Sequence, residues 1–454
     1  MLAIRPVPAQ SLALTPDPSV SSDLPRLSHL GRLYFLHIPK AAGTSIRLWL
    51  DGLFDVADCC PAYHPFELAD DPGAELARHR FFTGHHQWRF AERWGEALGL
   101  QVITFLREPV ARGLSELRYL RQFAPEEAAR WRDRSWVRGW VLDAQETLSD
   151  AEIAALPRFV AEEGSRQTRE LGLVAGDLPP GRWDHPAIAI GKRQLEAAIA
   201  HLASMVGFGL VEDMERSALV IADALGLPAR PMGFKVNVTG EAAPAPPAEA
   251  QAAMIAANGY DLRLHEAARA MFFARFTALL ARHGLTDDPA GHRALAARLD
   301  AAFATTDRGV KLLATLSADM SRGMVLDGFQ QRFFYEPLGR WLRWSQGADA
   351  RLWLPVDRSD KRRLVLDIAF FSDESTRDGL TVEIDGEPVA PTLAYPRWRV
   401  PAGAGEGTEE AYHIAVSVEL PPLVHSPQYT QVALKLPREV EGGGALALAG
   451  LRVE

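Results

Sequence analysis

The chain has 454 residues, 47% of them apolar and 24% charged, and this ordinary globular composition excludes a fibrous or wholly disordered protein. Its 49 lysines and arginines stand against 58 aspartates and glutamates. The resulting formal net charge of −9 argues against nucleic acid as the main partner. The length leaves room for two or three domains with buried cores.

The first 30 residues are rich in proline and lack the basic start and compact apolar run of a secretory signal, so we expect a flexible leader over 1–30. No stretch approaches the ~18 consecutive apolar residues that span a bilayer, and we expect no transmembrane segment. The two cysteines, Cys59 and Cys60, are adjacent and provide neither a disulfide framework nor a zinc site. A reducing, cytoplasmic location is therefore the expectation.

Residues 31–304 alternate short apolar runs with helical stretches. This pattern predicts an α/β fold, a P-loop-like three-layer domain with a central parallel sheet. A loop rich in proline and alanine follows Val238, and helical periodicity returns from Glu249 to Phe303. The predicted strands are Leu33–Ile38, Arg80–Thr83, Val102–Leu106, Ala187–Ile190 and Met205–Leu210.

The pattern changes after these helices. We expect a helical connector over 305–328 and an antiparallel β-sandwich domain over 329–454, where short alternating segments recur between turn residues. Asp385-Gly386 after one such segment predicts a tight hairpin. The aromatic side chains of this region suit either carbohydrate contact or the core of a small sandwich, and both interpretations stay open: Trp341, Trp344, Trp353, Tyr395 and Trp398.

The most informative segment is the turn between the first predicted strand and the helix that follows it. Gly43 lets the backbone approach an anion closely, and the amides at the start of the helix point outward with the positive end of the helix dipole. Thr44 and Ser45 add hydroxyl donors, and Lys40 adds a movable charge. The spacing is not that of a Walker A loop. A helix start capped by its own Ser and Thr is the alternative.

The string His37-Ile-Pro-Lys-Ala-Ala-Gly-Thr-Ser resembles the 5′-phosphosulfate loop of the Golgi-type carbohydrate sulfotransferases, the heparan sulfate 2-O-sulfotransferase-like family with bacterial members. These enzymes use 3′-phosphoadenosine 5′-phosphosulfate (PAPS). Ala41 stands here where the family commonly has threonine. The resemblance implies that Lys40 and the backbone of Ala41, Ala42, Gly43, Thr44 and Ser45 bind the 5′ end of the donor.

A second basic motif follows the predicted strand Val102–Leu106. Pro109 suits the first position of a helix on which Arg112, Ser115 and Tyr119 share one face, and Arg107 lies at the strand end, where ligands gather in open α/β sheets. The segment is similar to the family's 3′-phosphate motif, R-[DE]-P-x-x-R-x-x-S, which implies that Arg107, Arg112 and Ser115 hold that phosphate. A surface helix with ordinary arginines is the alternative.

Between the two motifs lies Gly84-His85-His86. In the family that the chain resembles, a strand followed by Gly-His carries the histidine that removes the proton of the acceptor hydroxyl, which implies that role for His85. Imidazole suits it, because its pKa near 6.5 lets it accept a proton around neutrality. His86 is the competing base. Relatives with a second histidine two residues before the base differ from this chain, which has Thr83 there.

Weaker similarities extend the resemblance over Arg32–Ala281. Ser165-Arg-Gln-Thr-Arg resembles a family segment written N-x-Q-T-R, and Phe208-Gly-Leu-Val-Glu resembles a late V-G-L-x-E strand. The stretch from Lys235 is like a loop that closes over the nucleotide in the family. That likeness implies donor contacts from three side chains: Lys235, Asn237 and Thr239.

The resemblance implies a sulfotransferase that moves a sulfuryl group from PAPS to a hydroxyl of a glycan or glycoconjugate, releases adenosine 3′,5′-bisphosphate (PAP), and needs no metal. Two alternatives stay open: a P-loop kinase or nucleotide hydrolase, and a glycan-binding or scaffold protein with an inactive transferase domain. The charge of −9 favours neutral or weakly charged glycans over heavily sulfated ones as acceptors, unless a local basic patch intervenes. The sequence indicates neither the acceptor nor an oligomeric state.

Overall fold

The computed structural model describes residues 27–64, 67–68, 73–120, 149–155, 163–177, 188–229, 248–305, 312–346, 348–399, 410–423, 429–437 and 444–454. The chain divides into two units. The parallel-sheet unit comprises 31–47 and 62–300, and the antiparallel-sheet unit comprises 1–30, 48–61 and 301–454. Residues 48–61 thus interrupt the first unit in sequence and group with the second. Among the described residues, no helix is long and apolar enough to cross a membrane.

Four parallel strands form the sheet of the first unit, in the order β2-β1-β3-β4. They are β1 (Arg32–Leu36), β2 (Phe81–Gly84), β3 (Leu100–Leu106) and β4 (Gly207–Leu210). Their near-continuous apolar runs are buried, as parallel strands covered on both faces require. The predicted parallel α/β sheet is therefore confirmed.

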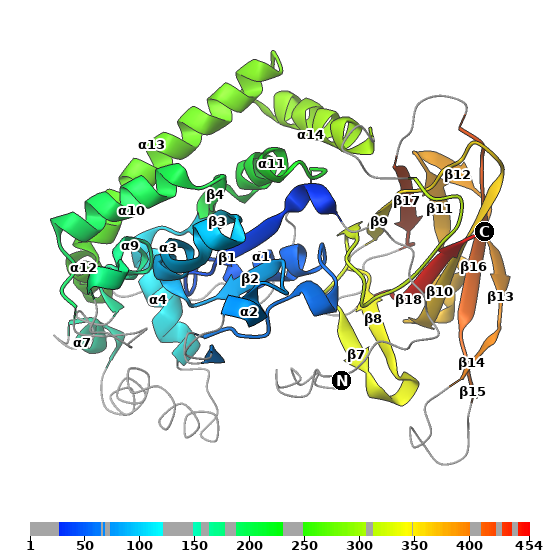
Figure 1. The fold of residues 1–454 in the computed structure, drawn as a ribbon, viewed down its shortest axis with the longest axis horizontal. Helices are drawn as coiled ribbons and strands as arrows, with labels where there is room; N and C mark the ends of the chain where they lie inside the picture. Colours follow the sequence, from blue (N-terminus) through cyan, green and yellow to red (C-terminus); the bar gives the residue numbers. More distant parts are fainter. Residues whose placement is uncertain are drawn as a thin grey trace. The chain divides into compact units, whose positions relative to one another are not determined.

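The helices of this unit surround the sheet in the ribbon of Figure 1. The described ones are α1 (Gly43–Asp51), α2 (Gly73–Leu76), α3 (Gln87–Leu98), α4 (Pro109–Leu120), α7 (Asp150–Ala155), α9 (Arg166–Gly172), α10 (Lys192–Ser204), α11 (Met214–Leu225), α12 (Ala248–Ala257), α13 (Gly259–Arg282) and α14 (Pro289–Ala304). Helices α1 and α14 each continue from one unit into the other.

One predicted strand of this unit is wrong. Residues 188–190, the described part of the expected strand Ala187–Ile190, have no regular secondary structure and lead into α10. The backbone carbonyl of Ile188 accepts a hydrogen bond from the Arg169 side chain at 3.0 Å instead of joining a strand ladder. This short apolar run is therefore an irregular segment before α10 and not a strand of the sheet.

The second unit contains antiparallel sheets, as expected after residue 329. The larger sheet has the order β13-β16-β10-β18-β8-β7, with β5 also paired to β18, and the other has the order β12-β11-β17-β9-β6; β14 and β15 pair separately. One hydrophobic core cluster draws on both larger sheets, with Leu364 and Val416 from one and Leu352 and Val432 from the other. Asp385 and Gly386 join β11 to β12 with φ of 52° and 87°, which confirms the predicted hairpin.

The strands of this unit, with its helix α15 (Glu374–Asp378), are β5 (Leu316–Asp319), β6 (Val325–Asp327), β7 (Phe333–Tyr335), β8 (Arg340–Trp344), β9 (Asp349–Leu354), β10 (Arg362–Phe371), β11 (Thr381–Ile384), β12 (Glu387–Val389), β13 (Thr392–Ala394), β14 (Arg397–Arg399), β15 (Glu410–Tyr412), β16 (Ile414–Leu420), β17 (Thr430–Lys435) and β18 (Leu446–Val453). The helical connector expected over 305–328 is not seen at β5 and β6. There Leu316 and Ala318 alternate with the less buried Ser317 and Asp319, which is the period of a strand.

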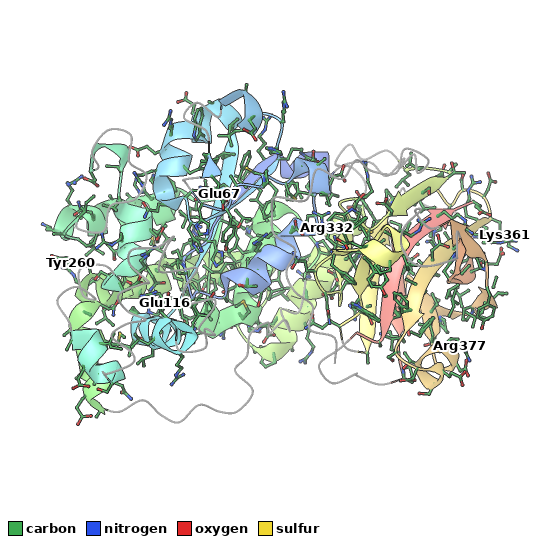
Figure 2. All side chains as sticks on the ribbon, turned by 90° about the horizontal axis from the view of Figure 1, so that it is seen from below. Glu67, Glu116, Tyr260, Arg332, Lys361 and Arg377 are labelled. Carbon is green, nitrogen blue, oxygen red and sulfur yellow. The ribbon has the colours of Figure 1, made fainter. Side chains whose placement is uncertain are left out.

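The aromatic residues singled out in this unit do not share one environment. Trp353 is buried in the core, Trp341 and Trp344 are half-buried, and Tyr395 is 55% exposed. The side chain of Trp398 lies outside the described ones. Charged side chains such as Lys361 and Arg377 lie at the surface of the unit, and both are labelled in Figure 2.

Candidate functional site

The loop between β1 and α1 has an unusual backbone. Lys40 and Ala42 have φ of 64° and 56°, in the left-handed region that residues other than glycine rarely occupy. The loop tightens through a hydrogen bond from the Ala41 amide to the Ile38 carbonyl at 3.3 Å, and α1 begins at Gly43. Such strain gathers at functional sites, and the amides of a first helical turn have no acceptor within their own helix. A helix start of this kind can bind an anion.

His37 fixes the shape of this loop from inside. A Cβ at Gly43 would lie 1.8 Å from two atoms of the His37 ring, so only glycine lets the imidazole pack against the start of α1. The Tyr63 hydroxyl forms a short hydrogen bond to His37 Nδ1. Burial lowers the pKa of His37 to about 3, and the nearby Arg47 and Lys40 add to the effect. His37 is therefore neutral at physiological pH, and its ring packs against the start of α1.

The two basic motifs meet at the carboxyl edge of the sheet. The Arg107 guanidinium donates from Nη1 to the Lys40 carbonyl oxygen at 3.1 Å. The Lys40 Nζ atom lies 4.0 Å from the centroid of the Tyr119 ring on α4, a cation–π contact. Burial lowers the pKa of Arg107, which nevertheless stays charged at neutral pH. The lysine of the first motif is thus held between the arginine and the helix of the second.

Gln167 braces Arg107 from α9. Its side-chain carbonyl accepts from the Arg107 amide at 2.9 Å, and its amide nitrogen donates to the Arg107 carbonyl at 2.8 Å. The Asp261 carboxylate in turn accepts from the backbone amides of Gln167 and Thr168 and from the Thr168 hydroxyl. The Gln-Thr part of the segment from Ser165 to Arg169 therefore holds the arginine loop in place.

The helix after Arg107 divides its polar residues between two environments. Ser115 and Tyr119 are partly exposed, whereas Arg112 is 0% exposed. Its Nη2 atom donates to the Glu163 carbonyl at 3.2 Å and lies 3.9 Å from the Glu163 carboxylate. Helix α4 carries these three residues on one face, as expected, but Arg112 near its start is buried and ties α4 to the segment before α9. Glu108 caps the helix by accepting from the amides of Val110 and Ala111.

The two adjacent histidines after β2 differ in burial. His86 is 2% exposed, its Nε2 is bonded to the Ala62 carbonyl at 3.0 Å, and burial lowers its pKa to about 4. His85 is half-buried, and its Nδ1 is bonded to the His37 carbonyl at 3.0 Å. A carbonyl only accepts, so this bond places the hydrogen of neutral His85 on Nδ1 and leaves the lone pair on Nε2. That tautomer is the one a proton acceptor at Nε2 needs.

The sequence did not indicate Tyr63 and His64, which stand beside His85. Their ring centroids lie 5.0 Å and 5.4 Å from that of His85. The His85 amide donates to the Tyr63 carbonyl at 2.9 Å, and Glu67, labelled in Figure 2, accepts from the amides of both Tyr63 and His64. In the sequence, a Tyr-His pair in a loop is the only signal that these two rings lie beside His85. Its pairing with His85 crosses about twenty residues of sequence.

Not every predicted site residue can be located. Lys235, Asn237 and Thr239 lie outside the described residues. Thr44 is exposed, Ser45 is half-buried and Thr83 is buried at the end of β2. In the described part of the chain, no three His, Cys, Asp or Glu side chains are grouped so that they could hold a metal ion.

The geometry thus brings together a strained loop at a helix start, two cations, and an imidazole with a defined tautomer. Such a set can bind a phosphorylated or sulfated group and accept a proton beside it. No protein-family model matches the chain, and no curated protein matches it either.

Proposed function

We propose that the chain is a sulfotransferase that moves a sulfuryl group from PAPS to a hydroxyl of a glycan or glycoconjugate. The observation that carries the proposal is the junction at Lys40, whose carbonyl oxygen accepts from Arg107 at 3.1 Å. Two motifs that resemble the two phosphate sites of one donor are thereby in direct contact, although 67 residues separate them in sequence. His85 stands at the same sheet edge, bonded to the His37 carbonyl.

Donor binding follows from the loop and its neighbours. The 5′-phosphate of PAPS would lie on the amides of residues 42–45, with the helix dipole of α1 and the Lys40 charge favouring it, because the Ala41 amide donates to the Ile38 carbonyl. Arg107 and Ser115 would hold the 3′-phosphate, and a guanidinium suits this role because it donates in a fixed fork. Arg112 supports α4 in this proposal and makes no contact with the donor. Contacts from Lys235, Asn237 and Thr239 remain predictions from the resemblance.

The transfer step needs the acceptor oxygen, the sulfur and the leaving oxygen in line, with a base beside the acceptor oxygen. The acceptor hydroxyl gives its proton to Nε2 of His85 as its oxygen forms a bond to sulfur, and the bond from sulfur to the 5′-phosphate oxygen breaks. The products are a sulfate ester, PAP and the imidazolium of His85, whose Nδ1–H still donates to the His37 carbonyl. Lys40 stabilises the charge that grows on the departing oxygen. Its contact with the Tyr119 ring contributes only about 0.5–1 kcal/mol, so the ammonium can leave it. The scheme requires no metal.

Transfer of radiolabelled sulfate from PAPS to a panel of glycans, glycolipids and phenols tests the proposal. We expect turnover in the wild-type chain and a loss of about 10²–10³-fold in Lys40→Ala, the size seen when one stabilising donor is removed. Lys192→Ala is the matched control, because Lys192 is exposed on α10 and, among the described residues, pairs with Glu196 one turn away. Equal turnover in the Lys40→Ala and Lys192→Ala variants would contradict the proposal. Tight PAP binding without transfer to any acceptor would favour an inactive transferase that binds glycans.

A further inference from the structure

Tyr63 contacts both parts of the site described above, although the transfer step assigns it no role. It lies in the loop between α1 and α2, which Glu67 holds by accepting from the Tyr63 amide at 2.5 Å and from the His64 amide at 3.1 Å. The hydroxyl of Tyr63 is bonded to His37 in the phosphate loop, and its backbone carbonyl is bonded to the base His85. One residue thus joins the two halves of the proposed reaction site.

The bond between Tyr63 and His37 determines where the hydrogen of the imidazole lies. His37 is neutral because burial lowers its pKa to about 3, so its ring carries a single N–H. A phenol is the stronger hydrogen-bond donor of the two groups, and an imidazole nitrogen is the stronger acceptor. The Tyr63 hydroxyl therefore donates to His37 Nδ1, and the hydrogen of His37 lies on Nε2.

The Nε2 atom of His37 lies beside the start of α1. A Cβ added to Gly43 would lie 1.8 Å from both Nε2 and Cδ2, which are the ring atoms nearest to that position. The amides of this first turn have no acceptor within the helix and favour an anion. With its hydrogen on Nε2, His37 adds a side-chain donor to these backbone donors. The other tautomer would place a lone pair there, which repels an anion.

The carbonyl of Tyr63 holds the other half of the site. It accepts from the His85 amide at 2.9 Å, and the ring centroids of the two residues lie 5.0 Å apart. This approach depends on Gly84, because an added Cβ there would lie only 2.2 Å from the Tyr63 carbonyl oxygen. Since the His37 carbonyl also accepts from His85 Nδ1 at 3.0 Å, the three residues form one hydrogen-bonded set.

Two neighbours keep the Tyr63 ring in place. The Arg47 guanidinium on α1 lies 4.8 Å from the centroid of the ring, a cation–π contact. The His64 ring stands at 90° to it, with the centroids 5.2 Å apart. A rotation of the Tyr63 ring would break these contacts together with the bond to His37. The hydroxyl is thus preorganised, which lowers the entropy lost when an anion binds.

We propose that Tyr63 is a positioning residue of the PAPS site: its hydroxyl keeps the hydrogen of His37 on Nε2, and this N–H donates to the anion bound at the start of α1. His37 is then a PAPS-binding residue in addition to Lys40 and the loop amides. The identity of the anion, the 5′ end of PAPS, rests on the proposed function. Removing the hydroxyl should therefore weaken PAPS binding, although Tyr63 itself touches no part of the ligand.

Nitrogen-15 NMR of the full chain tests the tautomer before any ligand is added. The two nitrogens of a neutral imidazole give well-separated signals according to which one carries hydrogen, and the His37 signals are identified by their loss in His37→Gln. We expect hydrogen on Nε2 of His37 in the wild-type chain at neutral pH, and a shift of the Nε2 signal when PAP binds. Hydrogen on Nδ1, or an Nε2 signal that bound PAP leaves unchanged, would overturn the proposal.

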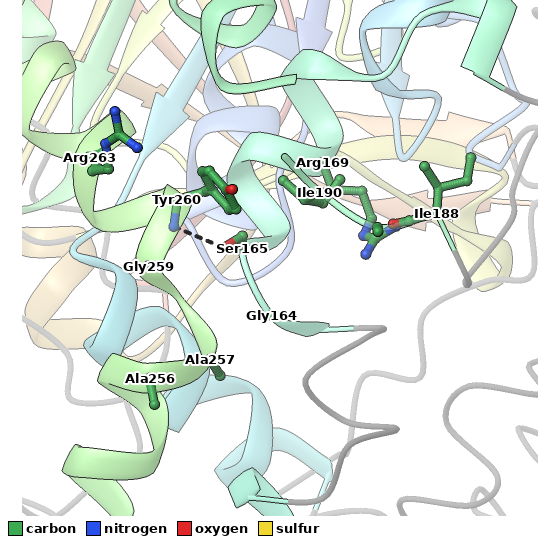
Figure 3. A pocket seen from close by; sticks show the side chains of 11 residues that line it. Gly164, Ser165, Arg169, Ile188, Ile190, Ala256, Ala257, Gly259, Tyr260 and Arg263 are labelled. Atoms are coloured by element: carbon green, nitrogen blue, oxygen red, sulfur yellow. Dashed lines mark hydrogen bonds between the residues drawn. The ribbon is translucent and has the colours of Figure 1, made fainter. Parts of the chain in front are cut away.

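Calorimetric titration with PAP measures the effect of the hydroxyl. Tyr63→Phe keeps the ring and its contacts, so it should fold, and we expect PAP binding about fivefold weaker, the size of one hydrogen bond. Tyr260→Phe is the matched control and should leave the affinity unchanged. Tyr260 lines a cavity at the junction of α12 and α13, where its amide donates to the Ser165 hydroxyl at 3.2 Å (Figure 3). Equal affinities of the two variants would overturn the proposal, whereas a wild-type chain that binds no PAP would contradict the proposed function instead.

A double variant shows whether Tyr63 acts through His37. Glutamine carries an amide NH2 group near the place of His37 Nε2 and has no tautomer to select. In a His37→Gln background, Tyr63→Phe should therefore weaken PAP binding by less than about twofold. A loss as large as that in the wild-type background would show that Tyr63 acts without His37, and would refute the positioning role.

Discussion

Acidification should destabilise the parallel-sheet unit through two buried imidazoles. Burial lowers the pKa of His37 to about 3 and that of His86 to about 4, whereas histidine in an unfolded chain titrates near 6.5. As the pH falls below 6.5, the unfolded chain takes up protons that the folded chain does not. The stability contributed by the neutral rings is therefore complete above pH 6.5 and is lost progressively down to pH 3–4.

The size of this loss at pH 5.0 follows from proton linkage. With an unfolded pKa of 6.5 and a folded pKa below 5, each histidine lowers the free energy of unfolding by RT ln(1 + 10^1.5), about 2 kcal/mol. The two together give about 4 kcal/mol relative to pH 7.5. The folded pKa values of about 3 and about 4 change this figure by less than about 0.1 kcal/mol. Ordinary domains are stable by about 5–15 kcal/mol, so this loss is readily measured.

Urea-induced unfolding at pH 7.5 and 5.0, followed by hydrogen exchange of the β1 and β3 amides, measures this difference in the unit concerned. His37→Gln removes one titrating ring, so its loss between the two pH values should be about 2 kcal/mol smaller than that of the wild type. His79→Gln is the control, since His79 is partly exposed before β2. The reasoning is refuted when His37→Gln loses as much stability on acidification as the wild type and the His79→Gln control.

Three further predictions concern single side chains and the contacts that they make. Gly43→Ala should displace the His37 ring and destabilise the unit by about 1–3 kcal/mol in urea unfolding, whereas Gly95→Ala, whose added methyl meets open space in α3, should be neutral or stabilising. Gln167→Ala should weaken PAP binding about tenfold in calorimetry, because Arg107 loses two hydrogen bonds; unchanged affinity would show that Arg107 needs no brace. Arg332, labelled in Figure 2, donates to Asp51 and to the Phe54 and Ser321 carbonyls, so Arg332→Met should destabilise the antiparallel-sheet unit by about 3–5 kcal/mol in thermal unfolding. A change as small as that of Arg377→Met, which removes a partly exposed arginine paired with Asp378, would contradict this.

Local sequence patterns predicted those elements whose conformation depends on contacts within a few residues. The parallel sheet follows from apolar runs such as Arg32–Leu36, and the hairpin follows from Asp385-Gly386, whose left-handed backbone few other pairs tolerate. The loop after β1 was predicted from Gly43 and its flanking polar residues. In each case the deciding contacts lie within a few residues of the motif.

The features that the sequence did not predict depend on contacts between segments far apart in the chain. The burial of Arg112 is decided by Glu163, fifty-one residues later in the chain, and helical spacing alone places it with Ser115. The choice between His85 and His86 depends on the carbonyls of His37 and Ala62. The strands at 316–319 and 325–327 take their pairing from β18 and β9, which a short alternating run does not specify.

Binding of PAP to the loop after β1 is the decisive measurement for the proposed donor site. Calorimetric titration with PAP and, separately, with ATP and Mg²⁺ distinguishes a sulfuryl donor site from a kinase-type site. We expect one PAP per chain without added metal, with affinity reduced at least about tenfold in both Lys40→Ala and Arg107→Gln. Binding of ATP with Mg²⁺ in place of PAP, or wild-type PAP affinity in both variants, would contradict it.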